Sequence, residues 1–263
     1  MLVVALPVTG NPVGSAPVVM SDEPLPPSSQ REYLWVDDFE ESPQVRAVRL
    51  GERPERFGRY VTRDARTLHF DQSGGVGGSG AVRMAWTAPA PNAKCEDDSR
   101  ILEASFPPAR ELVIQYYVRY SPGFAFDWTN RGPCTGNAKK LFLLWATTGS
   151  RFVFIAENGM LGVGSDYDHP LFAQNRGVTI SLSDLADGRW HRVTLQVRQA
   201  TTAQRADGAI VGWIDGVRRW EYDNIVTHNA GGYYLFKLPA TFNSGSPRTQ
   251  TEWVDELRIW RVP

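Results

Sequence analysis

The sequence predicts an all-β fold in which two antiparallel sheets pack face to face. Several segments alternate apolar and polar residues with the period of two that a half-buried strand requires, most clearly 111–120 and 192–198. Asp-Gly pairs, such as Asp215-Gly216, separate neighbouring segments and are typical of hairpin turns. No segment longer than a turn or two has the apolar spacing of a helix. These three observations together favour a β-sandwich.

Length and composition are those of one sizeable domain with a short extension. The chain has 263 residues, of which 42% are hydrophobic and 22% charged, with a formal net charge of -1. A charge balance this even gives no global field that would attract nucleic acid. No apolar run approaches the roughly 18 residues needed to span a bilayer. Residues 1–30 are rich in Pro, Gly and Ser and predict an extended arm or linker, while 31–263 form the predicted domain.

Three motifs resemble a known superfamily. G-R-W-H-R-V-T at 188–194, W-I-D-G-V at 213–217 and W-V-D-E-L-R-I-W at 253–260 resemble the signature of laminin-G-like members of the concanavalin A-like superfamily. The resemblance covers roughly 33–262 and implies a jelly-roll β-sandwich with long loops. The overall layout is more distantly similar to alginate- and glucuronan-lyase-like jelly rolls. This fold carries lectins, glycosidases, lyases and adhesion modules, so it does not define a function by itself.

The strand at 111–120 predicts a sugar-binding surface. Leu112, Ile114 and their alternating neighbours face one side, and Gln115, Tyr117 and Arg119 face the other. An amide, a phenol and a guanidinium on one surface suit a glycan, although the solvent-facing side of any antiparallel sheet has the same pattern. The predicted glycan-binding residues are Gln115, Tyr117, Arg119, Trp128, Lys140, Tyr234 and Lys237.

Two functions are compatible with this surface: catalysis on a glycan, and glycan binding without catalysis. The chain lacks the nucleophile elbow G-x-S-x-G, the zinc motif H-E-x-x-H and the E-x-D-x-E strand of retaining glycosidases. A polysaccharide lyase acting by β-elimination on uronate glycans would use Gln115, Tyr117, Arg119 and Lys140 as neutralising and proton-transferring groups. Because the R-T-E-L-R, Q-I-H and G-G-K-L-P-G motifs of such lyases are absent, glycan binding without catalysis is the favoured prediction.

The resemblance and the cysteine count give two further expectations. By resemblance, Asp38 or Glu40 would share a structural calcium ion with Asp255, and the alternative is solvated carboxylates near Arg258. Cys95 and Cys134 lie in two loop-like segments and predict a disulfide, with two unpaired thiols as the alternative.

Three functions therefore remain open at the level of sequence. The first is a secreted or surface module that binds extracellular polysaccharide. The second is a lyase for acidic polysaccharide. The third is a structural surface or assembly protein that uses residues 1–30 as an arm on a neighbouring subunit. All three predict a location outside the cytoplasm, in the extracellular space, the periplasm or on a cell or particle surface.

Overall fold

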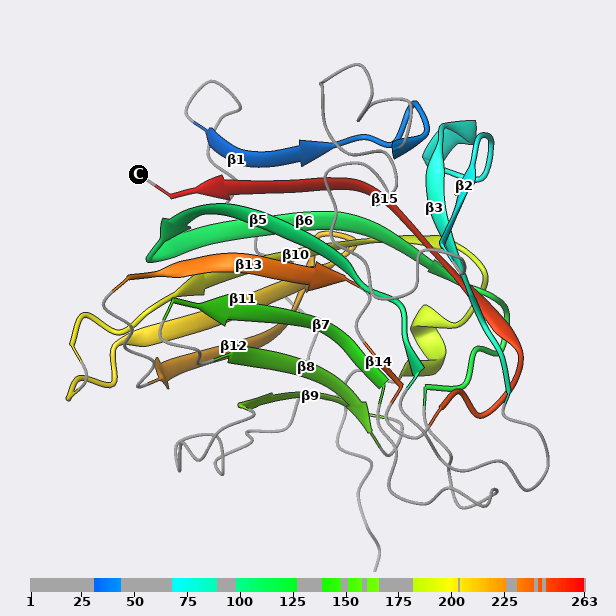
Figure 1. Ribbon diagram of the computed structural model, residues 1–263. Coiled ribbons are helices and arrows are strands. Elements are labelled where there is room, and N and C mark those ends of the chain that lie inside the picture. Colours follow the sequence, from blue (N-terminus) through cyan, green and yellow to red (C-terminus); the bar gives the residue numbers. More distant parts are fainter. Residues whose placement is uncertain are drawn as a thin grey trace, which may run out of the picture.

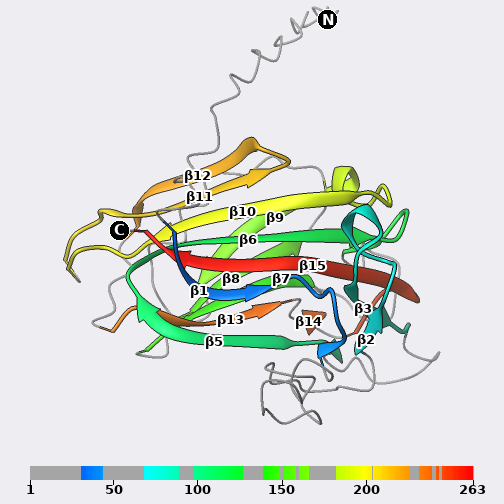
Figure 2. The same cartoon turned by 90° about the horizontal axis from the view of Figure 1, so that it is seen from above.

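Two antiparallel sheets make up the computed structural model and lie one over the other (Figure 1, Figure 2). The structure describes residues 31–43, 68–88, 98–126, 139–147, 151–157, 160–165, 182–202, 204–225, 231–238, 241–242 and 245–262. Its elements are strands β1 to β15 and two short 3₁₀ turns, η4 (Val76–Gly78) and η6 (Leu182–Leu185). The predicted all-β jelly-roll sandwich is confirmed.

Sheet A is the larger sheet and contains both ends of the described domain. Its strands follow the order β12-β11-β10-β6-β15-β3-β2, and β1 pairs with β15 as well. Every pairing in it is antiparallel. The strands are β1 (Glu32–Asp37), β2 (Leu68–Asp71), β3 (Ala81–Trp86), β6 (Glu111–Tyr120), β10 (Trp190–Arg198), β11 (Gly208–Ile214), β12 (Val217–Ile225) and β15 (Gln250–Arg261).

Sheet B covers the other side of the core. Its strands follow the order β4-β14-β7-β13-β5, and β8 pairs with both β7 and β9. The strands are β4 (Asp98–Ser99), β5 (Leu102–Ala109), β7 (Lys139–Ala146), β8 (Arg151–Glu157), β9 (Met160–Ser165), β13 (Tyr233–Leu238) and β14 (Thr241–Phe242). In Figure 2, which looks down on β12, β11, β10, β6 and β15, the strands of sheet B lie behind them or toward the β5 side.

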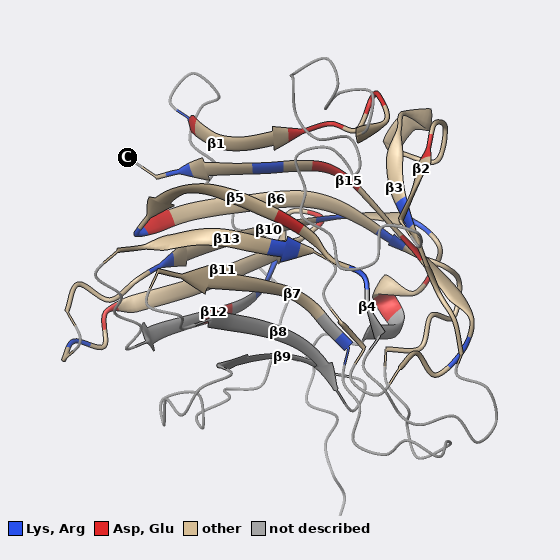
Figure 3. Cartoon of the chain, viewed as in Figure 1, with Lys and Arg blue, Asp and Glu red and all other residues tan. Residues whose placement is uncertain are grey.

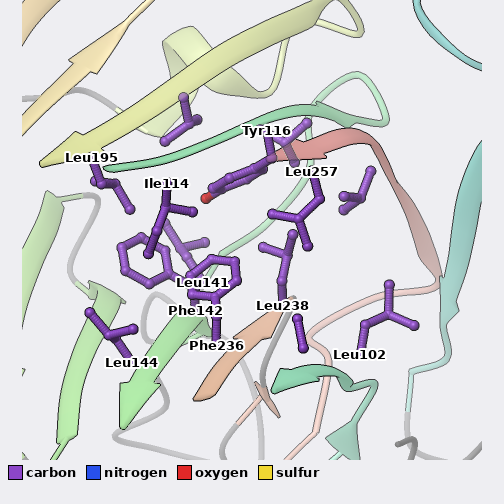
Figure 4. Packing of buried hydrophobic residues seen from close by; sticks show 14 of the residues in the cluster. Leu102, Ile114, Tyr116, Leu141, Phe142, Leu144, Leu195, Phe236, Leu238 and Leu257 are labelled. Atoms are coloured by element: carbon purple, nitrogen blue, oxygen red, sulfur yellow. The ribbon is translucent and has the colours of Figure 1, made fainter. Parts of the chain in front are cut away.

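The core lies between the sheets and is built from the alternating residues of each strand. Tyr116 of β6 meets Phe142 of β7 and Phe236 of β13, with ring centroids 6.5 and 6.1 Å from the Tyr116 ring. Figure 4 shows these side chains converging from the two sheets together with the surrounding leucines. Each large apolar side chain buried in this way contributes roughly 1.5–3 kcal/mol. The predicted division of 111–120 into a core face and an outer face is confirmed by Ile114 and its alternating neighbours in this cluster.

The last strand, β15, joins three strands of sheet A. Its first half pairs with β3 and its second half with β1, and β6 runs along its other edge. The change of partner falls at a break in the β6 register between Asp255 and Arg258, where Glu256 has a φ of 49°. This bulge turns the edge of β15 from one partner strand to the other.

Three sequence predictions differ from the structure. The sequence predicts that Lys140 shares a face with Phe142 and Leu144. A register shift between Lys140 and Phe142 opposite β8 changes the alternation, so Lys139 is the lysine whose side chain lies in the interior. The sequence also predicts a loop at 162–177, but 162–165 belong to strand β9. It predicts a strand at 178–184, but the described residues of that segment, 182–184, belong to the 3₁₀ turn η6.

Candidate functional site

The outer face of sheet A carries the polar residues predicted from β6. Gln115 lies opposite Thr194 of β10 and Arg258 of β15, and Tyr117 lies opposite Arg192. The amide nitrogen of Gln115 donates a hydrogen bond of 3.1 Å to the Thr194 hydroxyl. Both side chains are buried, with 5% and 1% exposure. Gln115 is therefore committed to the structure of the sheet rather than presented to a ligand.

Arg119 occupies the end of the same face, between two tryptophans. Trp190 of β10 and Trp253 of β15 are its direct cross-strand neighbours. The guanidinium carbon lies 5.1 Å from the Trp190 ring centroid and 4.1 Å from that of Trp253. The Trp253 indole also donates a hydrogen bond of 3.1 Å to Asp71 of β2. Cation–π attraction from both rings holds the guanidinium in place.

The outer face of sheet B carries an ion pair that is largely shielded from water. The ammonium of Lys237 on β13 lies 2.5 Å from a carboxylate oxygen of Glu103 on β5, which is its cross-strand partner. Lys237 is only 8% exposed although it points away from the core. Its ammonium is also 5.2 Å from the ring centroid of Trp145 on β7. Figure 3 shows charged stretches on β5 and β13 in sheet B and further ones on β15 in sheet A.

The structure therefore divides the predicted site residues between two opposite faces. Gln115, Tyr117 and Arg119 lie on the outer face of sheet A, across the core from Lys237. Lys140 pairs with Thr241 of β14 in sheet B, and its side chain lies outside the described part. Tyr234 is half-buried at a bulge in β13. One sugar cannot contact both faces at once, so Gln115, Tyr117 and Arg119 do not share a site with Lys237.

A second ion pair lies inside the sandwich. The Lys139 ammonium is 2.9 Å from a Glu252 carboxylate oxygen, and both side chains are shielded from solvent. The Trp86 indole donates a hydrogen bond of 3.1 Å to the same oxygen. The Lys139 ammonium sits 4.3 Å from the Trp86 ring centroid and 5.0 Å from that of Phe242. Burial, with the nearby Glu252 charge, raises the pKa of Tyr120 well above its ordinary value.

The motif at 188–194 has a structural explanation in a histidine held by two aspartates. His191 is 5% exposed. Its Nδ1 lies 2.7 Å from Asp215 and its Nε2 lies 3.1 Å from Asp187. Asp215 sits in the two-residue turn between β11 and β12, where it and Gly216 have φ values of 54° and 77°, the positive values of a type I′ turn. The motifs 188–194 and 213–217 are therefore linked through this histidine.

The charge of Asp187 stabilises the fold near neutral pH. Burial works to raise its pKa, but hydrogen bonds from the Arg189 backbone, the Arg189 guanidinium and His191 lower it from 3.8 to about 2. A depressed pKa contributes stability above the unfolded value, and this contribution is lost as the pH falls toward the folded value.

We expect the stability advantage of the natural protein over Asp187→Asn to be constant above the unfolded pKa of 3.8 and to disappear as the pH falls toward about 2. Urea unfolding of both proteins over this range measures the difference. Asp184→Asn, at an exposed carboxylate in η6, is the matched control. A difference that stays constant throughout the acid range would contradict the role of the Asp187 charge.

Asp255 of the predicted calcium site is engaged by protein donors. One of its carboxylate oxygens accepts hydrogen bonds from the Val76 backbone at 2.9 Å and the Ser79 hydroxyl at 3.0 Å. Burial raises the pKa of Asp255 in spite of these bonds. Asp38 and Glu40 are exposed, and no three acidic, histidine or cysteine side chains gather as metal ligands among the described residues. Calcium binding stays a prediction.

Several predicted features fall outside the described residues. These are the arm at 1–30, the aromatic candidate Trp128 and the predicted disulfide between Cys95 and Cys134. In the part of the chain that is described, no helix combines the length and the apolar character needed to cross a bilayer.

The fold is that of known polysaccharide lyases. Neither a protein-family model nor a curated protein sequence matches the chain. Among solved structures, an alginate lyase, Aly36B with an alginate trisaccharide, is 14% identical with a TM-score of 0.58 over 88% of this chain and 99% of its own. The endo-β-1,4-glucuronan lyase of the fungus Trichoderma reesei is 16% identical with a TM-score of 0.52 over 74% and 87%. The alginate lyase vAL-1 of a Chlorella virus is 12% identical with a TM-score of 0.52 over 79% and 95%.

These similarities support the jelly-roll fold. They do not single out the laminin-G-like branch, nor do they favour a lectin. At sequence identities this low, the structural similarities establish only the fold, and the functional site follows from the residues of this chain.

Four residues that define the two faces are not among the site residues predicted from the sequence. Glu103 lies in β5, a strand whose Pro107 and Pro108 obscured its pattern. Trp145 and Trp253 belong to predicted strands and Trp190 lies just before the predicted strand at 192–198, but the neighbours of all three across the sheet depend on strand order. That order is not contained in the local pattern of any one strand.

Proposed function

We propose that the chain is a polysaccharide lyase that cleaves uronate-containing glycans by β-elimination, with the reacting sugar over the outer face of sheet B. The observation that carries this proposal is the shielded Lys237, held by Glu103 beside the ring of Trp145. The similarity in fold to alginate and glucuronan lyases supports the same class of reaction.

The reaction needs three kinds of group. In the elimination, a base removes the proton on carbon 5 of the uronate, and the bond from carbon 4 to the glycosidic oxygen breaks. The electron pair of that bond leaves on the oxygen, which is protonated by an acid, and a carbon 4–carbon 5 double bond forms in conjugation with the carboxylate. A cation that neutralises the carboxylate makes the carbon 5 proton easier to remove. In our proposal Lys237 is this cation, and Tyr234 and Lys140 are the candidates for proton transfer.

Sheet B offers lysine as well as tyrosine for proton transfer, whereas the outer face of sheet A offers Tyr117 beside Arg119. Arginine stays protonated at all accessible pH values, so Arg119 cannot serve as the base or the acid. Lysine and tyrosine exchange protons much more readily, and β7 and β13, which carry Lys140, Tyr234 and Lys237, are hydrogen-bonded neighbours. Low exposure at Lys237 also strengthens its attraction to a substrate carboxylate, because water screens the pair less.

Binding without chemistry is the second candidate function. It is favoured by the pairing of Lys237 with Glu103, because a lysine already paired with a carboxylate is less able to neutralise the uronate carboxylate during elimination. Either function places the protein where acidic polysaccharides occur, outside the cytoplasm.

The first test is an assay of the natural protein with polyglucuronate and alginate. We expect an ultraviolet absorption band from the conjugated double bond to grow with time, together with chain shortening measured by gel filtration. A carboxyl-reduced, neutral polymer is the control substrate and should give neither signal, because it has no carboxylate to neutralise. Unchanged absorbance with both polymers, in the presence of binding measured by affinity electrophoresis, would replace the lyase by the binding function.

A further inference from the structure

Arg119 is a cation without an anionic partner. Within the described residues it makes no hydrogen bond or ion pair, and its Nε is buried without an acceptor. The buried indole nitrogen of Trp190 lacks an acceptor as well. Asp71 influences the Arg119 charge, but its carboxylate accepts a hydrogen bond from Trp253. Burial lowers the pKa of Arg119, with Asp71 acting in the opposite direction.

A partly buried arginine with unused donors is costly to maintain. A guanidinium carries five N–H donors in a rigid fork, and each donor removed from water without a partner raises the free energy of the folded state. Only Nε of Arg119 is among the buried nitrogens, so the two terminal nitrogens face solvent. The two indoles fix the plane of the fork. An anion from outside would complete this arrangement.

We propose that Arg119, with Trp190 and Trp253, forms a second binding site for acidic polysaccharide, in which the guanidinium pairs with a uronate carboxylate. A planar carboxylate matches the guanidinium fork with two parallel hydrogen bonds. Arg83 and His69 continue the same row across β3 and β2, and both are exposed, so the row complements an anionic chain. The choice of a uronate rests on the proposed function.

This site is separate from the reacting face. Arg119 lies on the outer face of sheet A and Lys237 on that of sheet B, with the core between them. A short oligosaccharide can occupy only one of them, whereas a long polymer can be retained at the Arg119 site while another segment reacts. The Arg119 site therefore acts on the capture of long chains and not on the chemical step.

Titration calorimetry in a background that combines Lys237→Met with Glu103→Gln (the Lys237→Met background) tests the second site with turnover strongly slowed. We expect uronate hexasaccharides to bind this variant at low ionic strength, and Arg119→Met to weaken that binding roughly tenfold to hundredfold, the worth of hydrogen bonds between charged groups. Arg119→Lys keeps a cation between the indoles but removes the fork, so we expect a loss of similar size in a protein of unchanged melting temperature. Arg248→Met, at an exposed arginine, is the matched control and should bind as the background does.

Three results would overturn the second site. They are an affinity unchanged by both Arg119 variants, the absence of residual binding in the Lys237→Met background, and equal binding of a neutral hexasaccharide. Inorganic sulfate provides a fourth test, because it shows whether the site prefers a carboxylate sugar to any anion. Displacement of the hexasaccharide by sulfate at equal concentration would also contradict the proposal. The failure of the lyase proposal is visible separately, as the absence of unsaturated product from the natural protein.

Discussion

Replacing Lys139 with methionine should lower the free energy of unfolding by about 3–5 kcal/mol, the usual result of removing one partner of a buried ion pair. Methionine has nearly the same length and leaves no large cavity. It does leave the Glu252 carboxylate without its cation, in surroundings shielded from solvent and with the Trp86 indole and the Tyr120 hydroxyl as remaining donors. Urea unfolding followed by tryptophan fluorescence measures the change, since Trp86 lies beside the pair.

A double substitution separates the missing charge from the missing contacts. In Lys139→Met with Glu252→Gln, the neutral amide oxygen can still accept the Trp86 hydrogen bond, so most of the stability should return. Such recovery is expected because desolvation of both charges offsets much of their attraction in the interior. If the double variant is as unstable as Lys139→Met alone, packing rather than charge is the reason.

Removing the Lys237 ammonium should reduce the lyase activity by roughly 10²- to 10⁴-fold in kcat/KM, the range for one electrostatic or proton-transferring group. The substitution is Lys237→Met, combined with Glu103→Gln so that no carboxylate is left without a partner. Tyr234→Phe should cause a loss within the same range, because it removes only the hydroxyl. Initial rates of unsaturated product formation measure both.

Controls for these variants are available in the chain itself. Tyr33→Phe removes the hydroxyl of an exposed tyrosine on sheet A and should leave the rate unchanged. Glu103→Gln alone keeps the Lys237 ammonium but removes the Glu103 carboxylate, which competes with the substrate carboxylate for that ammonium. The KM for polyglucuronate should therefore fall or stay the same. Full activity in Lys237→Met with Glu103→Gln would exclude sheet B as the reacting face.

Local sequence patterns predict much of the fold. The strands at 81–86 and 111–120 have the predicted bounds, because apolar alternation and the adjoining turns coincide there. The pattern failed where alternation is broken, at the bulge of β7 that places Lys139 inside, and in β5, where two prolines occur among the strand residues. A bulge adds one residue to one strand of a pair, and a single sequence contains no mark of its position.

The candidate site was harder to predict, because it depends on which strands become neighbours. The types of residue were identified, and Arg119 and Lys237 remain central to the two proposals. Their separation onto opposite faces follows from β6 lying in sheet A and β13 in sheet B. Glu103 meets Lys237 and Trp190 meets Arg119 only through pairings between distant segments of the chain.

The placement of β15 has a consequence for biosynthesis. Residues 250–261 follow all the other described strands of the sandwich in the chain, yet they lie in the interior of sheet A, between β6 on one edge and β1 and β3 on the other. Until this segment is made, β1 has no partner strand among the described strands and only the β10 edge of β6 is paired. Sheet A can close only after these residues emerge, so the nascent chain must keep apolar strands such as β3 and β6 from associating with other chains until β15 has been made.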